Sequence, residues 1–172
     1  MTRRYMLKIF LAVVISISLL LPGIAVAGKV QIPEGKEVKI IFDPTMELNS
    51  NNLVEGIPLL VNLYESIEIG GVIIVEKGAS GTAVVEKVEK SGRGGKAGYV
   101  KITFVDLTPK GEFQAPEGEK IKLAGFVENK GGGKKLLSWL FIFGLFIKGG
   151  GGEIDTGVPY TATVAEPIIL EN

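Results

Sequence analysis

The stretch Ile32-Pro33-Glu34-Gly35-Lys36-Glu37-Val38-Lys39-Ile40 reads as a tight turn that opens a β-strand. Proline fixes φ at the first central position of a turn, and glycine supplies a positive φ after it. From Val38 onward apolar and polar residues alternate, which predicts that Val38, Ile40 and Phe42 share one buried face. The segment therefore predicts an antiparallel strand that begins at a sharp reversal of the chain.

Three further segments repeat this pattern. Starting from Gly35, the successive key glycines are 43, 40 and 39 residues apart. Each reads apolar-x-x-Gly-x-x-apolar, except that Gly81 replaces the apolar residue in the second copy. Pro-x-Gly also recurs by chance in β proteins, but four nearly evenly spaced copies favour a structural repeat. The spacing is too irregular for a solenoid. The three copies are 75–83, 115–123 and 154–162.

Other alternating or apolar segments fill the gaps between these turns and predict further strands. A glycine-rich stretch, 92–98, predicts a flexible hairpin loop with Arg93 and Lys96 at its tip. Many short strands, frequent turn signals and little helical periodicity favour an all-β fold, a small antiparallel β-barrel whose closure hides the sheet edges. The expected strands are 57–65, 72–75, 82–90, 99–107, 121–127 and 160–164.

The first 27 residues have the pattern of a secretory signal peptide. They combine a basic start, an apolar run over 9–21 and the small-x-small end Ala25-Val26-Ala27. The alternative is an uncleaved membrane anchor, because the apolar run approaches the length that spans a bilayer. Arg3-Arg4 also resembles a twin-arginine signal, although the very apolar core favours ordinary unfolded export. We therefore expect an exported protein, located in the periplasm or associated with the outer membrane.

Removal of residues 1–27 would leave a single domain, 28–172, which is long enough for one hydrophobic core. That domain carries 16 basic and 19 acidic residues, a net charge of −3. Nucleic acid is therefore not an expected partner, because phosphate binding needs a basic surface. The chain has no cysteine, so neither a disulfide nor a lipid-modified cysteine is expected.

The segment Lys134–Lys148 reads KKLLSWLFIFGLFIK and forms the apolar centre of a glycine-flanked insert, 131–152. Soluble domains rarely expose such a run, so we expect it in lipid, in a protein partner or in the core. It predicts a short helix or hairpin between late strands of the barrel, and its glycines favour a segment that protrudes. The residues expected to contact a membrane or partner are Leu136, Leu137, Trp139, Leu140, Phe141, Ile142, Phe143, Leu145, Phe146 and Ile147, flanked by Lys134, Lys135 and Lys148.

The length of this apolar run limits how it can meet a membrane. As a helix, its 12 residues, 136–147, would reach about 18 Å, which is short of the ~30 Å hydrocarbon core. A single strand in lipid would leave its backbone unpaired, so a spanning strand would need identical neighbours in a ring. The flanking lysines could extend to lipid head groups, with Trp139 near the interface. Burial within the barrel remains the competing prediction.

Several segments together resemble the C-terminal β-barrel domain of the core-channel protein of type IV secretion and conjugation systems. The match covers roughly residues 30–127. Four features carry the likeness: the turn before the first strand, an Asn-Ser connection before the second strand, a segment that runs into the second repeated turn, and a later strand followed by a Pro-Lys-Gly turn. In that order they are 32–35, 48–50 with 55–56, 73–81, and 100–107 with 109–111.

The resemblance implies a barrel fold and a place in the cell envelope. In that family, an apolar insert between barrel strands enters the outer membrane and lines a pore, and residues 134–148 hold a comparable place in this sequence. The chain lacks the cytoplasmic segment and the long proline-rich linker of the family. The resemblance therefore implies a stand-alone exported relative rather than a subunit that secretes DNA or effectors.

Catalytic chemistry has few candidates, because the chain contains no histidine and no cysteine. This excludes a Ser-His-Asp triad, a thiol nucleophile and nearly all zinc sites. We expect no catalytic, metal or cofactor-binding residues. A carboxylate-only hydrolase is an alternative, and it would need two acids about 5–10 Å apart in a cleft. Its candidates are Asp43, Glu47, Glu55, Glu65 and Glu68.

These observations predict a non-enzymatic exported cell-envelope protein. Its barrel would act as a scaffold or assembly module that contacts the outer membrane, or an oligomeric partner, through the apolar insert. The alternative is a soluble periplasmic binding module in which the apolar segment is buried. In the first case the expected partners are a membrane, another protein or further copies of the chain.

Overall fold

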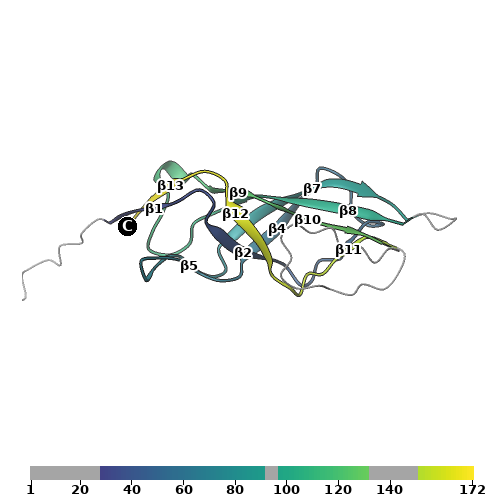
Figure 1. Ribbon diagram of the computed structural model, residues 1–172, viewed down its shortest axis with the longest axis horizontal. Coiled ribbons are helices and arrows are strands. Elements are labelled where there is room, and N and C mark those ends of the chain that lie inside the picture. Colours follow the sequence, from purple (N-terminus) through teal and green to yellow (C-terminus); the bar gives the residue numbers. More distant parts are fainter. Residues whose placement is uncertain (1–27, 92–96, 132–150) are drawn as a thin grey trace, which may run out of the picture.

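The computed structural model describes residues 28–91, 97–131 and 151–172. They form an elongated, all-β domain (Figure 1). The strands are β1 (Lys29–Ile32), β2 (Glu37–Phe42), β3 (Leu48–Asn49), β4 (Pro58–Leu63), β5 (Ile67–Ile69), β6 (Val72–Val75), β7 (Ser80–Glu89), β8 (Tyr99–Leu107), β9 (Ile121–Ala124), β10 (Phe126–Lys130), β11 (Glu153–Ile154), β12 (Tyr160–Val164) and β13 (Ile168–Glu171), with one 3₁₀ turn, η1 (Pro116–Gly118).

Six strands close into a small antiparallel barrel, which confirms the predicted fold class. Their order is β8-β7-β4-β2-β12-β9, and β9 pairs back onto β8. The seventh strand, β10, continues β9 and pairs only with β8. Closure requires pairings such as Tyr160↔Ile40, between strands far apart in the sequence.

All four repeated turns open strands of this barrel, namely β2, β7, β9 and β12. In the first three, the key glycine has a positive φ: +77° at Gly35, +79° at Gly78 and +74° at Gly118. The amide of Gly35 donates to Val164 at the end of β12, and the amide of Gly78 donates to Leu63 at the end of β4. The turns therefore fix where each new strand meets its neighbour.

Two details of the predicted turns are wrong. The first turn closes with a bond from the Lys36 amide to the Pro33 carbonyl, so Pro33 precedes the two central residues rather than occupying the first of them. In the fourth copy Gly157 has no positive φ. There the Asp155 carboxylate accepts a hydrogen bond from the Gly157 amide at 2.7 Å, and this side-chain turn replaces the glycine conformation.

The predicted strand over 121–127 is also wrong in one respect, because Gly125 divides it. Gly125 has φ +127°, and a Cβ there would lie 3.4 Å from the Cα of Ala162. Its carbonyl still accepts the Phe104 amide, so the ladder with β8 continues through the break. The chain bends at this glycine, and β10 then leaves β12 and extends beyond the closed part of the barrel.

Apolar side chains fill the barrel interior. Phe42 lies at its centre, with ring centroids 6.0 Å from Phe104 and 5.7 Å from Tyr160. The predicted inward face of β2 is confirmed, since Val38, Ile40 and Phe42 are all buried. A six-stranded barrel is narrower than the eight-stranded barrels that side chains just fill, so this interior is a packed core.

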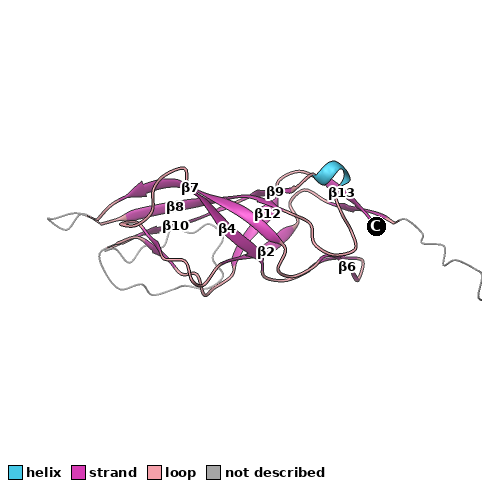
Figure 2. Cartoon of the chain, turned by 180° about the vertical axis from the view of Figure 1, so that it is seen from behind, coloured by secondary structure: helices cyan, strands magenta, loops and turns pink. Residues whose placement is uncertain are grey.

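The chain enters and leaves the described domain at one end of its long axis. There β1 and β13 form a two-stranded ribbon, and the Gly28 amide donates to the Asn172 side chain at 2.5 Å. The β5–β6 hairpin lies toward the same end, whereas β11, the end of β7 and the start of β8 lie at the opposite end (Figures 1 and 2). The barrel thus has a terminus end and, opposite it, the end from which residues 132–150 depart.

Candidate functional site

The candidate site is the end of the barrel that carries the apolar insert, which we call the insert end. The strand before the insert, β10, finishes at Lys130, and the strand after it, β11, begins at Glu153. The Asn129 side-chain amide donates to the Glu153 carbonyl at 2.5 Å. The two roots of the insert therefore lie side by side, so residues 132–150 begin and end at neighbouring points.

A buried serine holds the returning root in place. The Ser50 amide donates to the Gly152 carbonyl at 2.8 Å, and the Gly152 amide donates to the Ser50 hydroxyl at 3.1 Å. Ser50 has no exposed surface. These two bonds continue the short β3–β11 ladder, in which Ile154 pairs with Leu48. The root of the insert is thus joined to the barrel by backbone and side chain together.

Two glycines allow this close packing. A Cβ at Gly152 would lie 2.6 Å from the Asn129 carbonyl oxygen, and a Cβ at Gly98 would lie 2.2 Å from the Ser50 hydroxyl. Gly131 is buried as well, and its amide donates to the Gly98 carbonyl at 2.7 Å. The sequence suggested that the flanking glycines let the segment protrude. Gly131 and Gly152 pack the roots against the barrel, and the segment between them lies outside the described residues, so that expectation stays a prediction.

The root of the glycine-rich loop reaches the same end. Asn51 accepts hydrogen bonds from the Ser91 amide and hydroxyl, at 3.2 and 2.9 Å. Residues 92–96, including Arg93 and Lys96, lie outside the described residues. The insert end therefore gathers the bases of two connections, 92–96 and 132–150, on one rigid platform.

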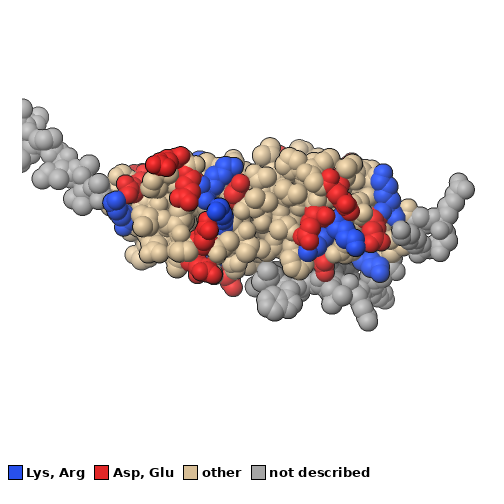
Figure 3. All heavy atoms as spheres, turned by 90° about the horizontal axis from the view of Figure 1, so that it is seen from above, with Lys and Arg blue, Asp and Glu red and all other residues tan. Residues whose placement is uncertain are grey.

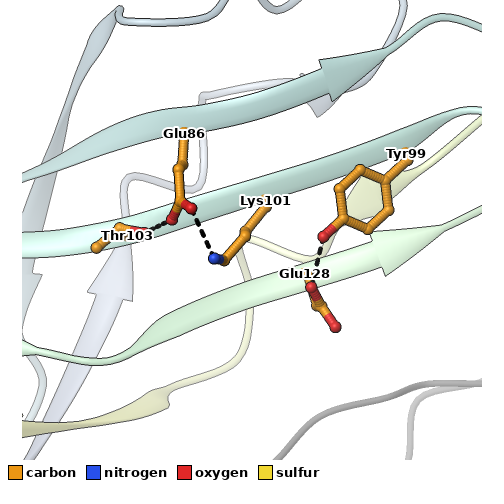
Figure 4. Close-up of polar contacts among 5 residues, drawn as sticks. All are labelled: Glu86, Tyr99, Lys101, Thr103 and Glu128. Carbon is orange, nitrogen blue, oxygen red and sulfur yellow. Dashed lines mark hydrogen bonds and ion pairs between the residues drawn. The ribbon is translucent and has the colours of Figure 1, made fainter.

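A ladder of polar side chains crosses the outer surface beside this platform (Figure 4). A β-bulge places Glu86 as an extra residue on β7, opposite the step from Lys101 to Ile102 on β8. Its carboxylate accepts hydrogen bonds from Lys101, at 2.7 Å, and from the Thr103 hydroxyl. Nearby, the Tyr99 hydroxyl donates to Glu128 at 2.5 Å. These contacts tie β7, β8 and β10 together on the surface.

The protonation of this ladder favours a structural role. Hydrogen bonds from Lys101 and then Thr103 lower the pKa of Glu86, so it remains a carboxylate at neutral pH. Partial burial, followed by its bond to the Glu128 carboxylate, raises the pKa of Tyr99, which therefore stays neutral. Neither group has a pKa near neutral pH, where a general acid or base works best.

Charged residues elsewhere on the surface occur in mixed groups. In the view of Figure 3, acidic and basic side chains gather in two clusters separated by a band of uncharged residues. Five ion pairs join described residues, and they include Lys101–Glu86, Lys120–Asp106 and Lys122–Glu166. The mixed signs give the face shown in Figure 3 no continuous patch of one charge.

The predicted contact residues all lie outside the described residues. These are the ten apolar residues between Leu136 and Ile147 together with Lys134, Lys135 and Lys148. Within 28–91, 97–131 and 151–172, no helix is long and apolar enough to span a bilayer. In the same ranges no three His, Cys, Asp or Glu side chains are grouped to hold a metal ion.

The acids considered for carboxylate chemistry are distributed over several sites. Asp43 accepts hydrogen bonds from Thr45, and those bonds lower its pKa. Glu47 accepts the Asn52 side chain at 3.3 Å, and Glu55 accepts the Val88 amide at 2.9 Å. Glu65 and Glu68 instead line one groove, together with Glu37.

That groove was not predicted from the sequence. It has a volume of about 840 Å³ and is formed by residues 36–39, 64–68 and Lys77. We call it the β2 groove, because it runs along the start of β2 where β4 has ended. Its only aromatic residue is Tyr64, over which the Lys77 ammonium lies 5.0 Å from the ring centroid. No local sequence signal marks the groove, since three separate segments form it.

Comparison with known proteins gives no match, whether the chain is compared with protein-family models, curated proteins or solved structures.

Proposed function

We propose that this chain is a non-enzymatic scaffold of the cell envelope, which presents residues 132–150 to the outer membrane or to an oligomeric partner. The observation that carries the proposal is the arrangement of the insert roots. Asn129, Ser50 and Gly152 fix both roots on one end of a packed barrel. Because both roots are fixed there, an apolar segment between them would be held at one defined end of the barrel.

The packed core supports a scaffold rather than a carrier. Phe42, Phe104 and Ile40 are almost fully buried inside the barrel and occupy the space that a ligand would need. Export through the N-terminal segment and attachment through the insert are both parts of this proposal. The soluble binding module remains the second candidate, and the β2 groove is the observation that favours it.

A loop replacement tests the proposal without disturbing the barrel. Because the roots are adjacent, residues 132–150 can be replaced by Asn-Gly, a short hairpin connection. We expect the replaced protein to keep its unfolding midpoint and to move from the membrane fraction to the soluble fraction after cell lysis. The matched control replaces 92–96 with the same dipeptide at the same end of the barrel, and it should stay with the membranes.

The single tryptophan gives a second readout, because Trp139 lies within the apolar segment. Brominated lipids should quench its fluorescence in vesicles if the segment enters a bilayer. Retention of the 132–150 replacement in the membrane pellet would contradict the proposal. A detergent-free monomer whose Trp139 is shielded from both lipid and aqueous quenchers would support the soluble module instead.

A further inference from the structure

The β2 groove has an open strand edge along one side. The Tyr64 amide donates to the Lys39 carbonyl at 2.7 Å, and β4 then turns away toward β5. The pairing of β2 with β4 covers Ile40 to Phe42. The start of β2 therefore continues past the end of its partner, and the groove occupies the position that a longer β4 would fill.

The direction of the backbone groups follows from the alternation along a strand. The Lys36 carbonyl accepts the Val164 amide and so faces β12, whereas the Lys39 carbonyl accepts the Tyr64 amide on the opposite side, toward the groove. Glu37 lies two residues before Lys39, so its N–H and C=O groups face the groove as well. No described residue bonds to the N–H or C=O of Glu37. Glu37 thus offers one donor and one acceptor to an incoming strand.

The side chains around this edge carry charges of both signs. Lys36, Lys39 and Lys77 supply three cations, and Glu37, Glu65 and Glu68 supply three carboxylates. None of these six forms an ion pair with another described residue, although five ion pairs occur elsewhere in the described chain. The groove therefore concentrates charged groups that have no opposite partner within ion-pair distance.

We propose that the β2 groove binds an extended peptide segment that bears both acidic and basic side chains, by pairing its main chain with the free edge of β2. Strand addition uses unpaired backbone groups for affinity and neighbouring side chains for specificity. The volume lies within the roughly 300–1,000 Å³ typical of ligand sites. A ligand of one charge would meet three repelling side chains, whereas a segment of both charges can complement all six. The inference is independent of the proposed function of the insert.

A short synthetic peptide tests this inference. The probe is Ac-Thr-Lys-Val-Glu-Thr-NH₂, whose β-branched residues favour an extended backbone. One control peptide carries N-methyl groups that remove its pairing amides, and the other replaces Lys and Glu with Gln. We expect the probe to bind at least about tenfold more tightly than either control. The Glu37 amide should show one of the largest shifts in a ¹H–¹⁵N titration of the full domain.

Two protein variants separate backbone pairing from charge. Glu37→Pro removes the free N–H at the first residue of β2, where proline is tolerated because that amide faces away from β12. It also removes the Glu37 carboxylate, so its affinity for the probe is compared with that of Glu37→Gln, which lacks the carboxylate alone. The double reversal Lys36→Glu, Lys77→Glu changes only the charge. Each should weaken the probe at least about tenfold. The matched control, Lys90→Glu with Lys130→Glu, reverses two exposed lysines outside the groove and should leave binding unchanged.

Three results would overturn the inference: equal affinity for the N-methylated peptide, no shift at Glu37 with millimolar probe, or binding of chitotetraose in place of the peptide. The last would identify a saccharide site. If Glu37→Pro fails to fold, the lysine reversal and the N-methylated peptide still decide the question.

Discussion

Gly152→Ala should destabilise the domain far more than Gly151→Ala, although the two glycines are adjacent. Neither has a positive φ, so alanine suits both backbones and only the surrounding space differs. The new Cβ at Gly152 would lie 2.6 Å from the Asn129 carbonyl oxygen and 3.1 Å from the Cα of Tyr99. At Gly151 it would meet the side-chain amides of Asn49 and Asn51 at 3.2 Å, and these can move.

The size of the effect follows from what must shift. Backbone atoms of β8 and β10 surround Gly152, so relief requires β11 to move away from both. Overpacking of this kind costs about 1–3 kcal/mol. Weakening the Ser50–Gly152 and Asn129–Glu153 hydrogen bonds adds about 1 kcal/mol for each bond lost. Alanine also lowers the conformational entropy of the unfolded chain, and this offsets about 0.4–1 kcal/mol of the lost stability. We expect a net loss of about 2–4 kcal/mol at Gly152 and less than about 1 kcal/mol at Gly151.

Urea unfolding followed by far-ultraviolet circular dichroism measures both values, with the slope of the transition as a check on two-state behaviour. A Ser50→Ala variant provides an independent route to the same contact and should cost about 1–3 kcal/mol, because it leaves the buried Gly152 amide unpaired. Equal stability of the two glycine variants would refute the close packing of the insert root. It would also remove the main support for a rigidly held insert.

Three further predictions address the core, the turns and the surface ladder. Phe42→Ala should cost about 3–5 kcal/mol in a denaturant titration, while exposed Leu60→Ala should cost less than about 1 kcal/mol. Gly35→Ala should cost about 1–2 kcal/mol because φ is +77°, and Gly157→Ala, at a turn without positive φ, should cost measurably less. Glu86→Gln should lower stability at pH 7 by less than about 1 kcal/mol, since the pair is half exposed. The folded-state pKa of Glu86 is lowered, so its contribution is present above the unfolded value of 4.5 and is lost as the pH falls through the lower folded pKa. The stability difference between the Gln variant and the parent should therefore shrink as the pH falls below 4.5, and a difference that stays constant would contradict the ion-pair explanation.

Local patterns predicted the long strands well, because two-residue periodicity reflects burial on one face. The predicted strands 99–107 and 160–164 coincide with β8 and β12, and 72–75 coincides with β6. The repeated turns located four barrel strands, since a glycine with positive φ in the first three, and the Asp155–Gly157 side-chain turn in the fourth, both leave a local sequence signature. The closure of the barrel was inferred from the number of predicted strands. The pairing of β9 with both β12 and β8 was not predicted.

The remaining features depend on contacts between distant residues. The β1–β13 ribbon joins two four-residue strands through pairs such as Gln31↔Ile169, and neither strand is long enough to show a period. In the sequence Gly152 is one of several glycines that flank the insert, whereas its close packing depends on the Asn129 carbonyl across the barrel end. The β2 groove exists because the start of β2 continues past the end of β4, and strand ends are the least certain part of any prediction.

The barrel gives the chain a polarity that constrains its two apolar segments. Residues 9–21 connect to the domain through Gly28, at the terminus end, whereas 136–147 connect through Gly131 and Gly151 at the insert end (Figure 1). The ten residues of β7 alone extend about 33 Å along the barrel. If the first segment is cleaved, 136–147 is the long apolar run that the sequence retains. If it remains as an anchor, the two apolar segments are joined to opposite ends of the described domain (Figure 1). N-terminal sequencing of the protein purified from its cells distinguishes these cases, because cleavage after Ala27 would give a start at Gly28.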